Sequence, residues 1–312
     1  MTARFSIIIP VYNRELVIEE TILSVLNQSF CDFECIVVDD NSNDRTLTIV
    51  RKYQASDSRI LLVSSTENKG ACFSRNLGLT LAKGKFICFL DSDDLLHPNY
   101  LEKQYYSLEQ IPDAGVAVCN SLFFRSSIKE STRFSPNLDY PINLSRYLSG
   151  EISWVTSCSL WRSSIIRDLK GFSQELSMWQ DWELNARYLS LGGTISITHD
   201  CLVYYRYQWN SDQVSSGHFN DKKHILNFYK SRQLILLINL NENKNISNEV
   251  RNILACNFAN LPNQLLDISH YKESILALFY SIYLERHLRP LKSFFMHVFW
   301  ILRNSILSQI TF

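Results

Sequence analysis

FSIIIPVYNRE, residues 5–15, decides the fold, because a run of β-branched residues ends in polar residues and is followed by a segment with helical spacing. The same order returns three more times before residue 110. Such alternation is typical of βαβ units around a parallel sheet, and runs that are apolar throughout indicate strands covered on both faces. We therefore predict an α/β fold with a mostly parallel sheet flanked by helices, with strands in 5–10, 33–38, 59–63 and 85–90 and helices in 15–28, 43–54, 70–82 and 97–109.

The pattern becomes less regular after residue 111. The elements expected there are strands in 115–124 and 153–160, a polar loop over 126–141, a helix over 179–191 and two short strands in 194–198 and 202–207. From residue 218 onward the spacing is helical only, with an Asn- and Ser-rich break at 241–248. We therefore divide the chain into a first domain, 1–215, and a helical extension, 216–312.

The composition is that of a folded globular protein, with 46% hydrophobic and 20% charged residues among 312. The 31 Lys and Arg residues balance the 31 Asp and Glu residues, so no net field attracts nucleic acid and we expect no such partner. The eight cysteines form no CxxC pair, and several lie in apolar runs. This predicts reduced cysteines in the core.

Targeting and membrane signals are weak. The apolar run near the N-terminus breaks at Pro10, too early for a secretory signal. No stretch approaches the ~20 apolar residues that cross a bilayer, and the nearest candidate, 294–302, contains His297. We expect a cytoplasmic protein that does not span a membrane, and contact with a membrane surface stays open.

LDSDD, residues 90–94, is the most specific motif, because an apolar run delivers three acids into a short loop. Asp91, Asp93 and Asp94 repel one another, and a hard divalent cation relieves this repulsion. Mg²⁺ or Mn²⁺ is commonly held by one or two carboxylates and shares its other positions with phosphate oxygens. The alternative is that Asp93 or Asp94 only caps a helix that begins near Leu95, and for Asp94 we favour capping.

Polar residues also follow the other predicted strands, at the edge where doubly wound sheets bind ligands. Pro10 and Tyr12 end the first strand, and the Tyr12 ring can either stack on a base or close the core. VVDD, residues 37–40, ends the second strand. Asp40 can accept a hydrogen bond from a nucleobase N–H, or it can hold an Asx-turn.

ENKGACFSRNLGL, residues 67–79, places Arg75 within the first turns of a helix that begins after Gly70. An arginine there can form a forked contact with a diphosphate or with an acid, or it can lie on the surface. The nine glycines contain no GxG spacing, and the chain has no GK[ST] sequence. Dinucleotide-binding and P-loop functions are therefore excluded.

In order and spacing, SIIIPVYNRE, VVDDNSNDRT, NKGACFSRNLGL and FLDSDDLLHPNYLE resemble the inverting family 2 glycosyltransferases of GT-A fold, of the type that builds bacterial surface polysaccharides. The resemblance spans about residues 5–215. It implies a Rossmann-like GT-A catalytic domain with a nucleotide-binding part, about 1–110, and an acceptor part, about 111–215. In the family, the acids of the DxD-like motif bind metal and ribose, which implies Mn²⁺ or Mg²⁺ on Asp93, with Asp91 on the metal or the donor ribose.

The resemblance assigns other donor-side positions as well. Pro10, Tyr12 and Asp40 would surround the base of the nucleotide, and Arg75 would lie near the diphosphate. Further along, YYRYQWNSDQVSS at 204–216 resembles the family segment that closes over the diphosphate. Many relatives carry a histidine where this chain has Gln208, so a third metal ligand from the protein is in doubt; His199 and His218, nearby in sequence, are interpreted as surface or loop residues.

SMWQDWELNARYL, residues 177–189, is similar to the acceptor-side segment of the family, in which an acid at the start of a helix is the general base. This implies that Asp181 accepts the proton of the acceptor hydroxyl. The alternatives are that Asp181 only caps the helix, where the helix dipole would temper its basicity, or that Glu183 is the base. Trp179 and Trp182 flank Asp181, and their indole faces suit sugar rings or the protein core equally well.

The tail, residues 286–312, contains no acid but carries Arg286, Arg289, Lys292 and Arg303 beside the apolar run FFMHVFWIL. A cationic, aromatic helix of this kind can lie in the headgroup layer of an anionic membrane. It can also pack on the catalytic domain or on a second subunit. Membrane contact would suit a lipid-linked acceptor and would place the protein at the inner face of the plasma membrane.

Together these features predict a metal-dependent hexosyltransferase that moves a sugar from a nucleotide diphosphate, with UDP favoured, to a hydroxyl of a growing, lipid-linked polysaccharide. Two alternatives remain. A sugar-phosphate nucleotidyltransferase typically needs a Gly-rich basic loop near its N-terminus, and PVYNRE contains no glycine. A non-catalytic glycan- or nucleotide-binding module is the other alternative, and the complete set of acids argues against it.

Overall fold

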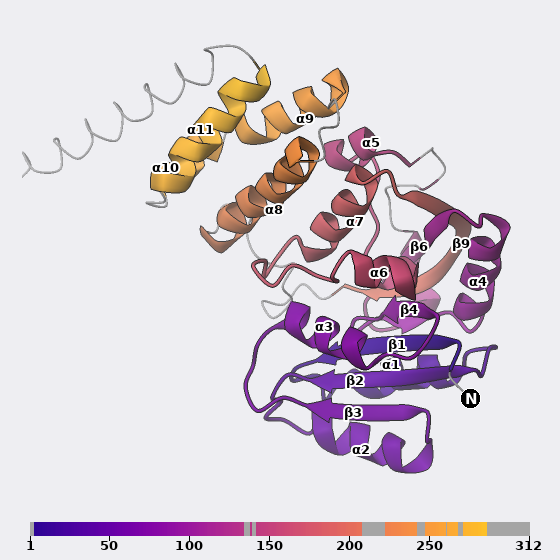
Figure 1. The fold of residues 1–312 in the computed structure, drawn as a ribbon. Coiled ribbons are helices and arrows are strands. Elements are labelled where there is room, and N and C mark those ends of the chain that lie inside the picture. The colour runs from indigo at the N-terminus through magenta and orange to yellow at the C-terminus, as the bar shows by residue number, and fades with distance from the viewer. Residues whose placement is uncertain are drawn as a thin grey trace, which may run out of the picture.

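A computed structural model describes residues 3–133, 138, 142–207, 222–241, 247–259, 261–267 and 271–285. Within these residues a central sheet is flanked by helices, and further helices gather at one end (Figure 1). The strands described are β1 (Phe5–Val11), β2 (Phe33–Asp39), β3 (Ile60–Ser64), β4 (Phe86–Phe89), β5 (Leu95–Leu96), β6 (Ala114–Phe124), β7 (Thr132–Arg133), β8 (Ser159–Arg162) and β9 (Thr194–Arg206). The predicted α/β architecture is confirmed.

The sheet joins a parallel half to a mixed half, in the order β3-β2-β1-β4-β8-β6-β9-β5, with β7 beside β6. Strands β1 to β4 are parallel to one another. β8 runs antiparallel between β4 and β6, β9 runs parallel to β6, and β5 pairs antiparallel with β9. The carboxyl ends of the parallel strands meet at one edge, so the polar residues that follow them come together there.

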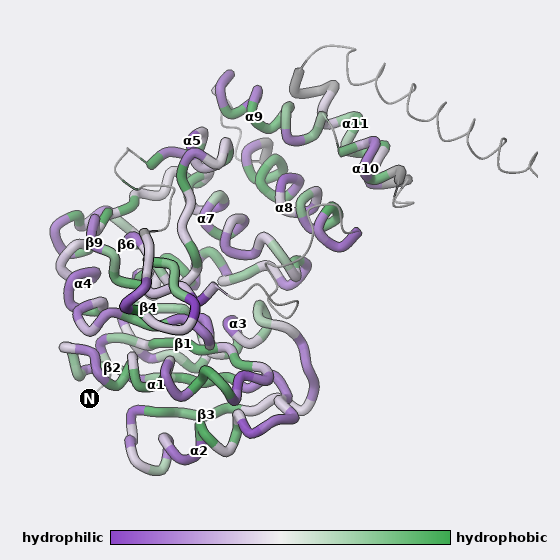
Figure 2. The backbone as a smooth tube through the Cα atoms, turned by 180° about the vertical axis from the view of Figure 1, so that it is seen from behind, coloured by the Kyte–Doolittle hydropathy of each residue, from purple (hydrophilic) through white to green (hydrophobic). Residues whose placement is uncertain are grey.

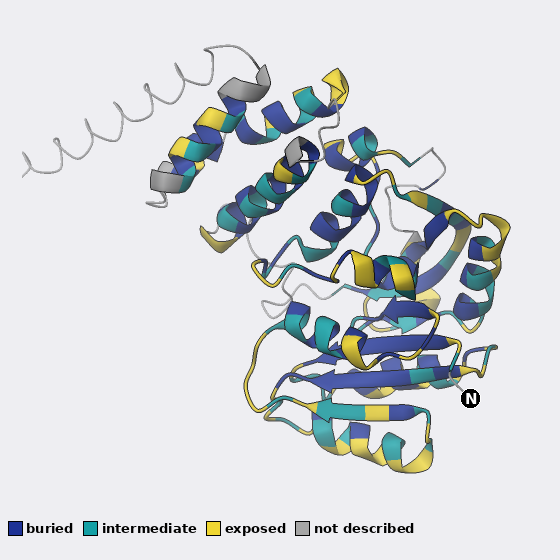
Figure 3. Cartoon of the chain, viewed as in Figure 1, coloured by how far each residue is buried: buried dark blue, intermediate teal, exposed yellow. Residues whose placement is uncertain are grey.

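The parallel half is buried because helices cover it. All seven residues of β1 are buried, whereas the edge strand β3 is partly exposed (Figure 3). The helices that connect these strands are α1 (Ile18–Leu26), α2 (Thr46–Ser56) and α3 (Ala71–Leu81). The strands and helices predicted up to residue 82, and the strand at 85–90, are therefore confirmed to within a few residues at their ends.

The segment after the acidic loop corrects one expectation. Leu95–Leu96 does not begin a helix but forms β5. The next helix, α4 (Tyr100–Gln110), begins only after Pro98, because proline disfavours helical backbone in the residue before it. Asp94 is therefore not a helix cap, and the interpretation of Asp94 as a cap near Leu95 is wrong.

β9 replaces the two short strands predicted over 194–198 and 202–207. It pairs in parallel with β6, with register shifts on either side of Asn120. The Asn120 side chain donates a hydrogen bond to the carbonyl oxygen of His199 (2.8 Å), which bridges the irregular stretch. A polar interruption in the sequence thus marks an irregularity within one strand, not the end of a strand.

Three further elements differ from the expected pattern. The strand predicted over 153–160 begins as a 3₁₀ turn, Thr156–Cys158, and continues as β8. The predicted polar loop over 126–141 contains a 3₁₀ turn and β7 within its described residues. Helices α5 (Leu144–Ser149) and α6 (Ser163–Asp168) have six residues each, which is too short to show a helical period in the sequence.

The remaining helices are α7 (Gln180–Ser190), α8 (Lys222–Asn241), α9 (Asn248–Ala259), α10 (Leu261–Asp267) and α11 (Tyr271–Glu285). α8 packs along α7, and both hydrophobic and hydrophilic residues occur along α8 and α11 (Figure 2). Of the predicted break at 241–248, residues 242–246 lie outside the described residues, which place the end of α8 at Asn241 and the start of α9 at Asn248. The proposed boundary near residue 215 lies outside the described residues.

All eight cysteines lie in the described part of the chain, and none forms a disulfide. Five are buried as predicted, but Cys31 and Cys256 are exposed. Among the described helices, none combines the length and the apolar character that a membrane span requires.

Candidate active site

A cleft of about 910 Å³ opens at the carboxyl edge of the parallel strands. Its walls come from the loops after β1, β2 and β4, from the beginnings of α3 and α7, and from α8. The seven residues singled out in the sequence all line this cleft: Pro10, Tyr12, Asp40, Arg75, Asp91, Asp93 and Asp181. The structure thus brings together groups that lie far apart along the chain.

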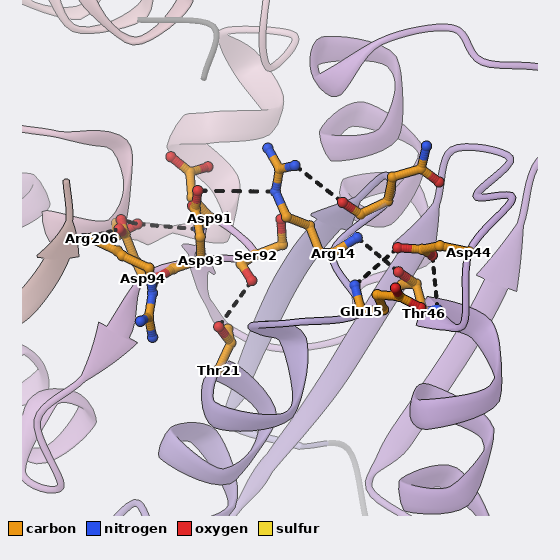
Figure 4. A network of polar contacts seen from close by, with 12 residues as sticks. Arg14, Glu15, Thr21, Asp44, Thr46, Asp91, Ser92, Asp93, Asp94 and Arg206 are labelled. Carbon is orange, nitrogen blue, oxygen red and sulfur yellow. Dashed lines mark hydrogen bonds and ion pairs between the residues drawn. The ribbon is translucent and has the colours of Figure 1, made fainter. Parts of the chain in front are cut away.

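The loop after β4 presents its three acids to different surroundings (Figure 4). Asp91 and Asp93 line the cleft, with side chains 28% and 19% exposed, whereas Asp94 is fully buried. The Asp94 N–H donates to the Asp91 carbonyl oxygen (3.1 Å), which closes a tight turn. The turn presents two carboxylates to the cleft and directs the third into the protein.

Asp94 holds this loop to the mixed half of the sheet. Its carboxylate accepts hydrogen bonds from the Ser157 hydroxyl (2.7 Å) and from the Arg206 backbone N–H (3.1 Å). The Arg206 side chain donates to the Asp93 carbonyl oxygen (2.9 Å). Burial, together with the charges of Asp93 and Asp91, raises the pKa of Asp94 well above its usual value. These contacts make Asp94 a support of the loop.

Asp91 and Asp93 have the chemistry of a divalent-cation site. Burial and the charge of Asp91 raise the pKa of Asp93, and Arg14, whose Nε lies 4.0 Å from the Asp93 carboxylate, offsets only part of this. A cation between the two acids would relieve their repulsion. In the part of the chain that the structure describes, no three His, Cys, Asp or Glu side chains are grouped to bind a metal. Two carboxylates still suffice for Mg²⁺ or Mn²⁺ when phosphate oxygens complete its coordination.

Of the histidines considered in the sequence, His199 is described and does not join this pair. His199 lies in the irregular part of β9 and does not line the cleft. Gln208, His218 and the tail at 286–312 lie outside the described residues.

Arg75 is buried beside the acidic loop. Its guanidinium donates hydrogen bonds to the Asp91 carboxylate (2.6 Å) and to the Gln180 side-chain oxygen (2.7 Å), and it lies 5.0 Å from the centre of the Phe172 ring. Its Nε is buried without a hydrogen-bond partner. Arg75 is therefore not a surface residue, and it links the acidic loop to the start of α7.

Asp40 ties the end of β2 to the loop before α3. Its two carboxylate oxygens accept the backbone N–H groups of Lys69 (2.8 Å) and Gly70 (2.7 Å). The Asx-type contact considered for Asp40 is made by Asp39, which accepts the Ser42 N–H (3.2 Å). Each oxygen of a carboxylate can accept a second hydrogen bond, so Asp40 can hold this loop and still receive a donor from the cleft.

The loop after β1 is braced against α2. Asn13 has a left-handed backbone (φ 50°), and the Arg14 N–H donates to the Thr46 hydroxyl (2.8 Å; Figure 4). Pro10 is buried within β1, whereas Tyr12 is 41% exposed and lines the cleft. Tyr12 therefore does not close the core, and its side chain is accessible to a ligand.

Asp181 lies in the first turn of α7 and lines the wall of the cleft that Gln180 and Trp179 share. Its carboxylate accepts the Trp182 N–H (2.8 Å). Burial raises the pKa of Asp181 above its ordinary value, although the Trp182 N–H and the charge of Arg75 oppose the shift. Asp181 thus accepts one N–H at the start of α7, and its raised pKa makes its carboxylate more basic than that of an ordinary aspartate.

The other residues considered around Asp181 differ in whether they line the cleft. Glu183 is buried in an ion pair with Arg187 (2.7 Å) and does not line the cleft, so the structure does not place it as a base. Trp182 belongs to the core, while Trp179 lines the cleft and has a left-handed backbone (φ 64°).

Two charged or titratable residues of the cleft wall were not singled out from the sequence. Arg14 follows Tyr12 by two positions, so its place after a predicted strand was an available signal. His224 comes from α8, and no local motif marks it. Only the packing of α8 against the rest of the chain brings it to the cleft.

Comparison with known proteins agrees with this geometry. The sequence model of the family described as Glycosyl transferase family 2 matches residues 6–169. The chain is 48% identical over 99 residues to the Escherichia coli UDP-Glc:alpha-D-GlcNAc-diphosphoundecaprenol beta-1,3-glucosyltransferase WfgD, an alignment that covers 32% of this chain and 38% of WfgD. The chain thus spans less than half the length of that relative.

Two solved structures share the fold. TarS 1–349 from S. aureus in complex with UDP-GlcNAc superposes with a TM-score of 0.64 at 20% identity, over 91% of this chain and 92% of that one. The mannosyltransferase PcManGT from Pyrobaculum calidifontis in complex with GDP-Man and Mn²⁺ gives 0.55 at 16% identity, over 96% and 86%. At these identities the likeness concerns the fold. Because the family match covers more than half of the chain, this protein belongs to Glycosyl transferase family 2, as its motifs predicted.

Proposed function

We propose that this protein transfers a sugar from a UDP-sugar to a hydroxyl of a growing, lipid-linked polysaccharide, with inversion at the anomeric carbon. The observation that carries the proposal is one cleft whose lining includes both a pair of accessible acids and a carboxylate of raised pKa. Membership of the family supports a transferase. The name of WfgD and the ligand of TarS support UDP as the nucleotide, while the GDP-Man in PcManGT marks the alternative.

The donor nucleotide would occupy the part of the cleft formed by β1 and β2. The exposed Tyr12 ring can stack on the base, with Pro10 behind it, and Asp40 can accept a base N–H on a remaining lone pair. Asp91, in the loop after β4, would bind the ribose hydroxyls. These assignments follow the family resemblance, and each of these residues lines the cleft.

Asp93 and Asp91 would hold Mn²⁺ or Mg²⁺, with Asp93 as the main ligand. The bound cation would supply positive charge to the departing diphosphate. Arg75 adds a fixed positive charge on the buried side of Asp91, in surroundings where a preorganised charge acts strongly. Both positive charges would therefore stabilise the negative charge that develops on the diphosphate as its bond to the sugar breaks.

Asp181 would act as the general base. The acceptor oxygen attacks the anomeric carbon from the face opposite the diphosphate, a new C–O bond forms, and the bond to the diphosphate oxygen breaks. Asp181 takes the hydroxyl proton during this step, and its raised pKa makes it a stronger base than an ordinary aspartate. A single displacement of this kind inverts the configuration.

A lipid-linked acceptor is supported by the name of WfgD, which specifies a diphosphoundecaprenol substrate. We propose that residues 1–215 form the catalytic domain, that 216–312 form the helical extension, and that the extension touches the inner face of the plasma membrane. On the described part of α11, Ile275 (47%) and Phe279 (63%) are exposed. They lie one helical turn apart, just before the cationic tail, where an apolar contact with lipid would continue that of the tail.

Two substitutions test the assignment. Asp181→Asn should preserve UDP affinity and lower turnover by about 10²–10⁴-fold, the usual contribution of a general base. Asp93→Ala should abolish Mn²⁺-dependent transfer and weaken UDP binding. The measurements are UDP affinity by calorimetry and transfer from a panel of nucleotide sugars to undecaprenyl-diphosphate-linked GlcNAc, each with and without Mn²⁺. The exposed Asp113→Asn is the matched control, and full turnover of Asp181→Asn would remove Asp181 from the mechanism.

A further inference from the structure

One face of α8 packs against the segment that leads into Asp181. Helices α7 and α8 lie side by side (Figure 1). The residues of α8 that contact this segment follow helical spacing: His224, Asn227, Phe228 and Arg232. α8, like Asp181, lies beyond the residues 6–169 that the family model matches.

Asn227 holds the backbone just before Trp179. Its side-chain oxygen accepts the N–H groups of Ser177 (2.8 Å) and Met178 (3.4 Å). Its side-chain nitrogen donates to the Ser177 hydroxyl (3.2 Å) and to the Lys223 carbonyl oxygen (2.8 Å). A single buried amide thus fixes two consecutive peptide groups to α8.

Trp179 sets the start of α7. It has a φ of 64°, a conformation that is rare for a bulky residue and persists only where the surroundings hold it. Its carbonyl oxygen accepts the Glu183 N–H (2.9 Å), so its orientation determines where the helix begins and where Asp181 lies. The rings of His224 and Phe228 contact its ring edge-on, at centroid distances of 5.3 and 5.4 Å.

Arg232 contacts the Trp179 ring and two neighbouring aromatic rings. Its guanidinium carbon lies 4.4 Å from the centre of the Trp179 ring, 3.7 Å from Trp182 and 3.6 Å from Phe228. The side chain donates to the Ser231 hydroxyl (2.9 Å), its Nε has no partner, and no ion pair with a described carboxylate is formed. Burial lowers the pKa of Arg232 well below its usual value. Burial of a cation disfavours folding, and within the described residues it is the rings of Trp179, Trp182 and Phe228, with no carboxylate, that contact this one.

We propose that Arg232, together with Asn227, positions Asp181 by holding Trp179. The inference rests on the proposed function, because it takes Asp181 as the base. Arg232 does not line the cleft and acts through Trp179, so it is a positioning residue. A displaced base lowers turnover, whereas UDP affinity depends on the loops after β1, β2 and β4 and stays unchanged.

Arg232→Met in the full-length protein tests this role, because methionine keeps the length of the side chain and removes its charge. We expect kcat with UDP-Glc or UDP-GlcNAc and undecaprenyl-diphosphate-linked GlcNAc to fall on the order of ten- to a hundredfold. The donor KM and the UDP affinity should not change, and the Tm should stay equal or rise, since a buried cation that no described carboxylate balances is lost. Lower activity at equal or higher stability is a result that a purely structural role would not give.

Three further variants sharpen the test. Arg232→Lys keeps a cation near the rings and should recover part of the lost kcat. Asn227→Ala loosens the same segment through a different contact and should also lower kcat at constant UDP affinity. Lys230→Met removes a partly exposed cation from the same helix and should leave kcat and Tm unchanged.

The possible results separate this inference from the proposed function. An active wild type with an unchanged kcat in Arg232→Met would overturn the inference alone. A kcat loss that accompanies a fall in Tm and a weaker UDP affinity would also overturn it, because Arg232 would then only maintain the fold. A wild type that neither binds UDP nor transfers sugar would overturn the proposed function together with this inference.

Discussion

Asp181 lies where two opposing effects meet at a single residue. The N-terminal N–H groups of α7 favour its charged form, and one of them, from Trp182, donates to its carboxylate at 2.8 Å. Burial acts in the other direction and is the larger effect, so the pKa of Asp181 is raised. The helix position of Asp181 is readable from the sequence, but its burial is not, since burial depends on segments far away in the chain.

The raised pKa has a consequence for the pH dependence of turnover. A general base must be deprotonated, so kcat should fall as pH decreases through the pKa of Asp181. Because that pKa is raised, the fall should be centred above the ordinary aspartate value of about 3.9. The measurement is kcat against pH at saturating donor, acceptor and Mn²⁺. A fall centred at or below the ordinary value would show that Asp181 is solvated or is not the base.

Among the elements, α3 carries Arg75 to the cleft by packing unusually close to the sheet. The packing depends on Gly78, because a Cβ at this position would overlap a methyl group of Ile8 in β1 and would come within 3.3 Å of Val38 in β2. Ile8 is fully buried and β-branched, so it has little freedom to move away. Because Gly78 has no side chain, α3 can pack closely on β1 and β2, and this close packing sets the position of Arg75.

Gly78→Ala should therefore destabilise the protein. Alanine gains about 1 kcal/mol of helix propensity over glycine, but overpacking in a rigid core costs about 1–3 kcal/mol. We expect a net loss of free energy of unfolding and a lower kcat, because Arg75 moves with α3. Urea unfolding and transfer assays measure the two effects. Thr80→Ala, at an exposed position of the same helix, is the control, and a Gly78→Ala protein as stable as wild type would refute the close packing.

The elements also show what local sequence can and cannot predict. Strands β1 to β4 follow from their apolar runs, and the acids Asp91 and Asp93 from their place after one of them. β5 and β9 do not follow, because β5 is a two-residue strand that pairs with β9 and contacts α1, and β9 continues through a polar interruption by pairing with β6. Elements that depend on a distant partner leave little trace in their own residues.

At the scale of the whole molecule, the cleft is built from segments that lie far apart along the described chain. The parallel half supplies the donor-side residues, α7 supplies Asp181, and α8 supplies His224. The seven side chains chosen from the sequence were found because each follows a strand or opens a helix within a recognisable motif. The contacts of Asn227 and Arg232 could not be predicted, because they arise only when α8 packs on α7.

We expect the cationic tail of the helical extension, residues 286–312, to bind an anionic membrane. Each Lys or Arg near an anionic lipid surface contributes about 1 kcal/mol, so the four cations of residues 286–312 should give measurable binding. Deleting 286–312 should lower the affinity for phosphatidylglycerol vesicles on the order of a hundredfold and leave UDP-sugar hydrolysis unchanged. Vesicle sedimentation at two salt concentrations measures the binding, which higher salt should weaken.

Two comparisons make this result specific. Phosphatidylcholine vesicles lack the negative charge and should bind the full-length protein weakly. Ile275→Ser with Phe279→Ser removes the exposed apolar contact of α11 and should lower vesicle binding by a smaller amount than the deletion, since the cations remain. If the deletion leaves binding to anionic vesicles unchanged, the tail does not contact lipid, and a role in packing against protein takes its place.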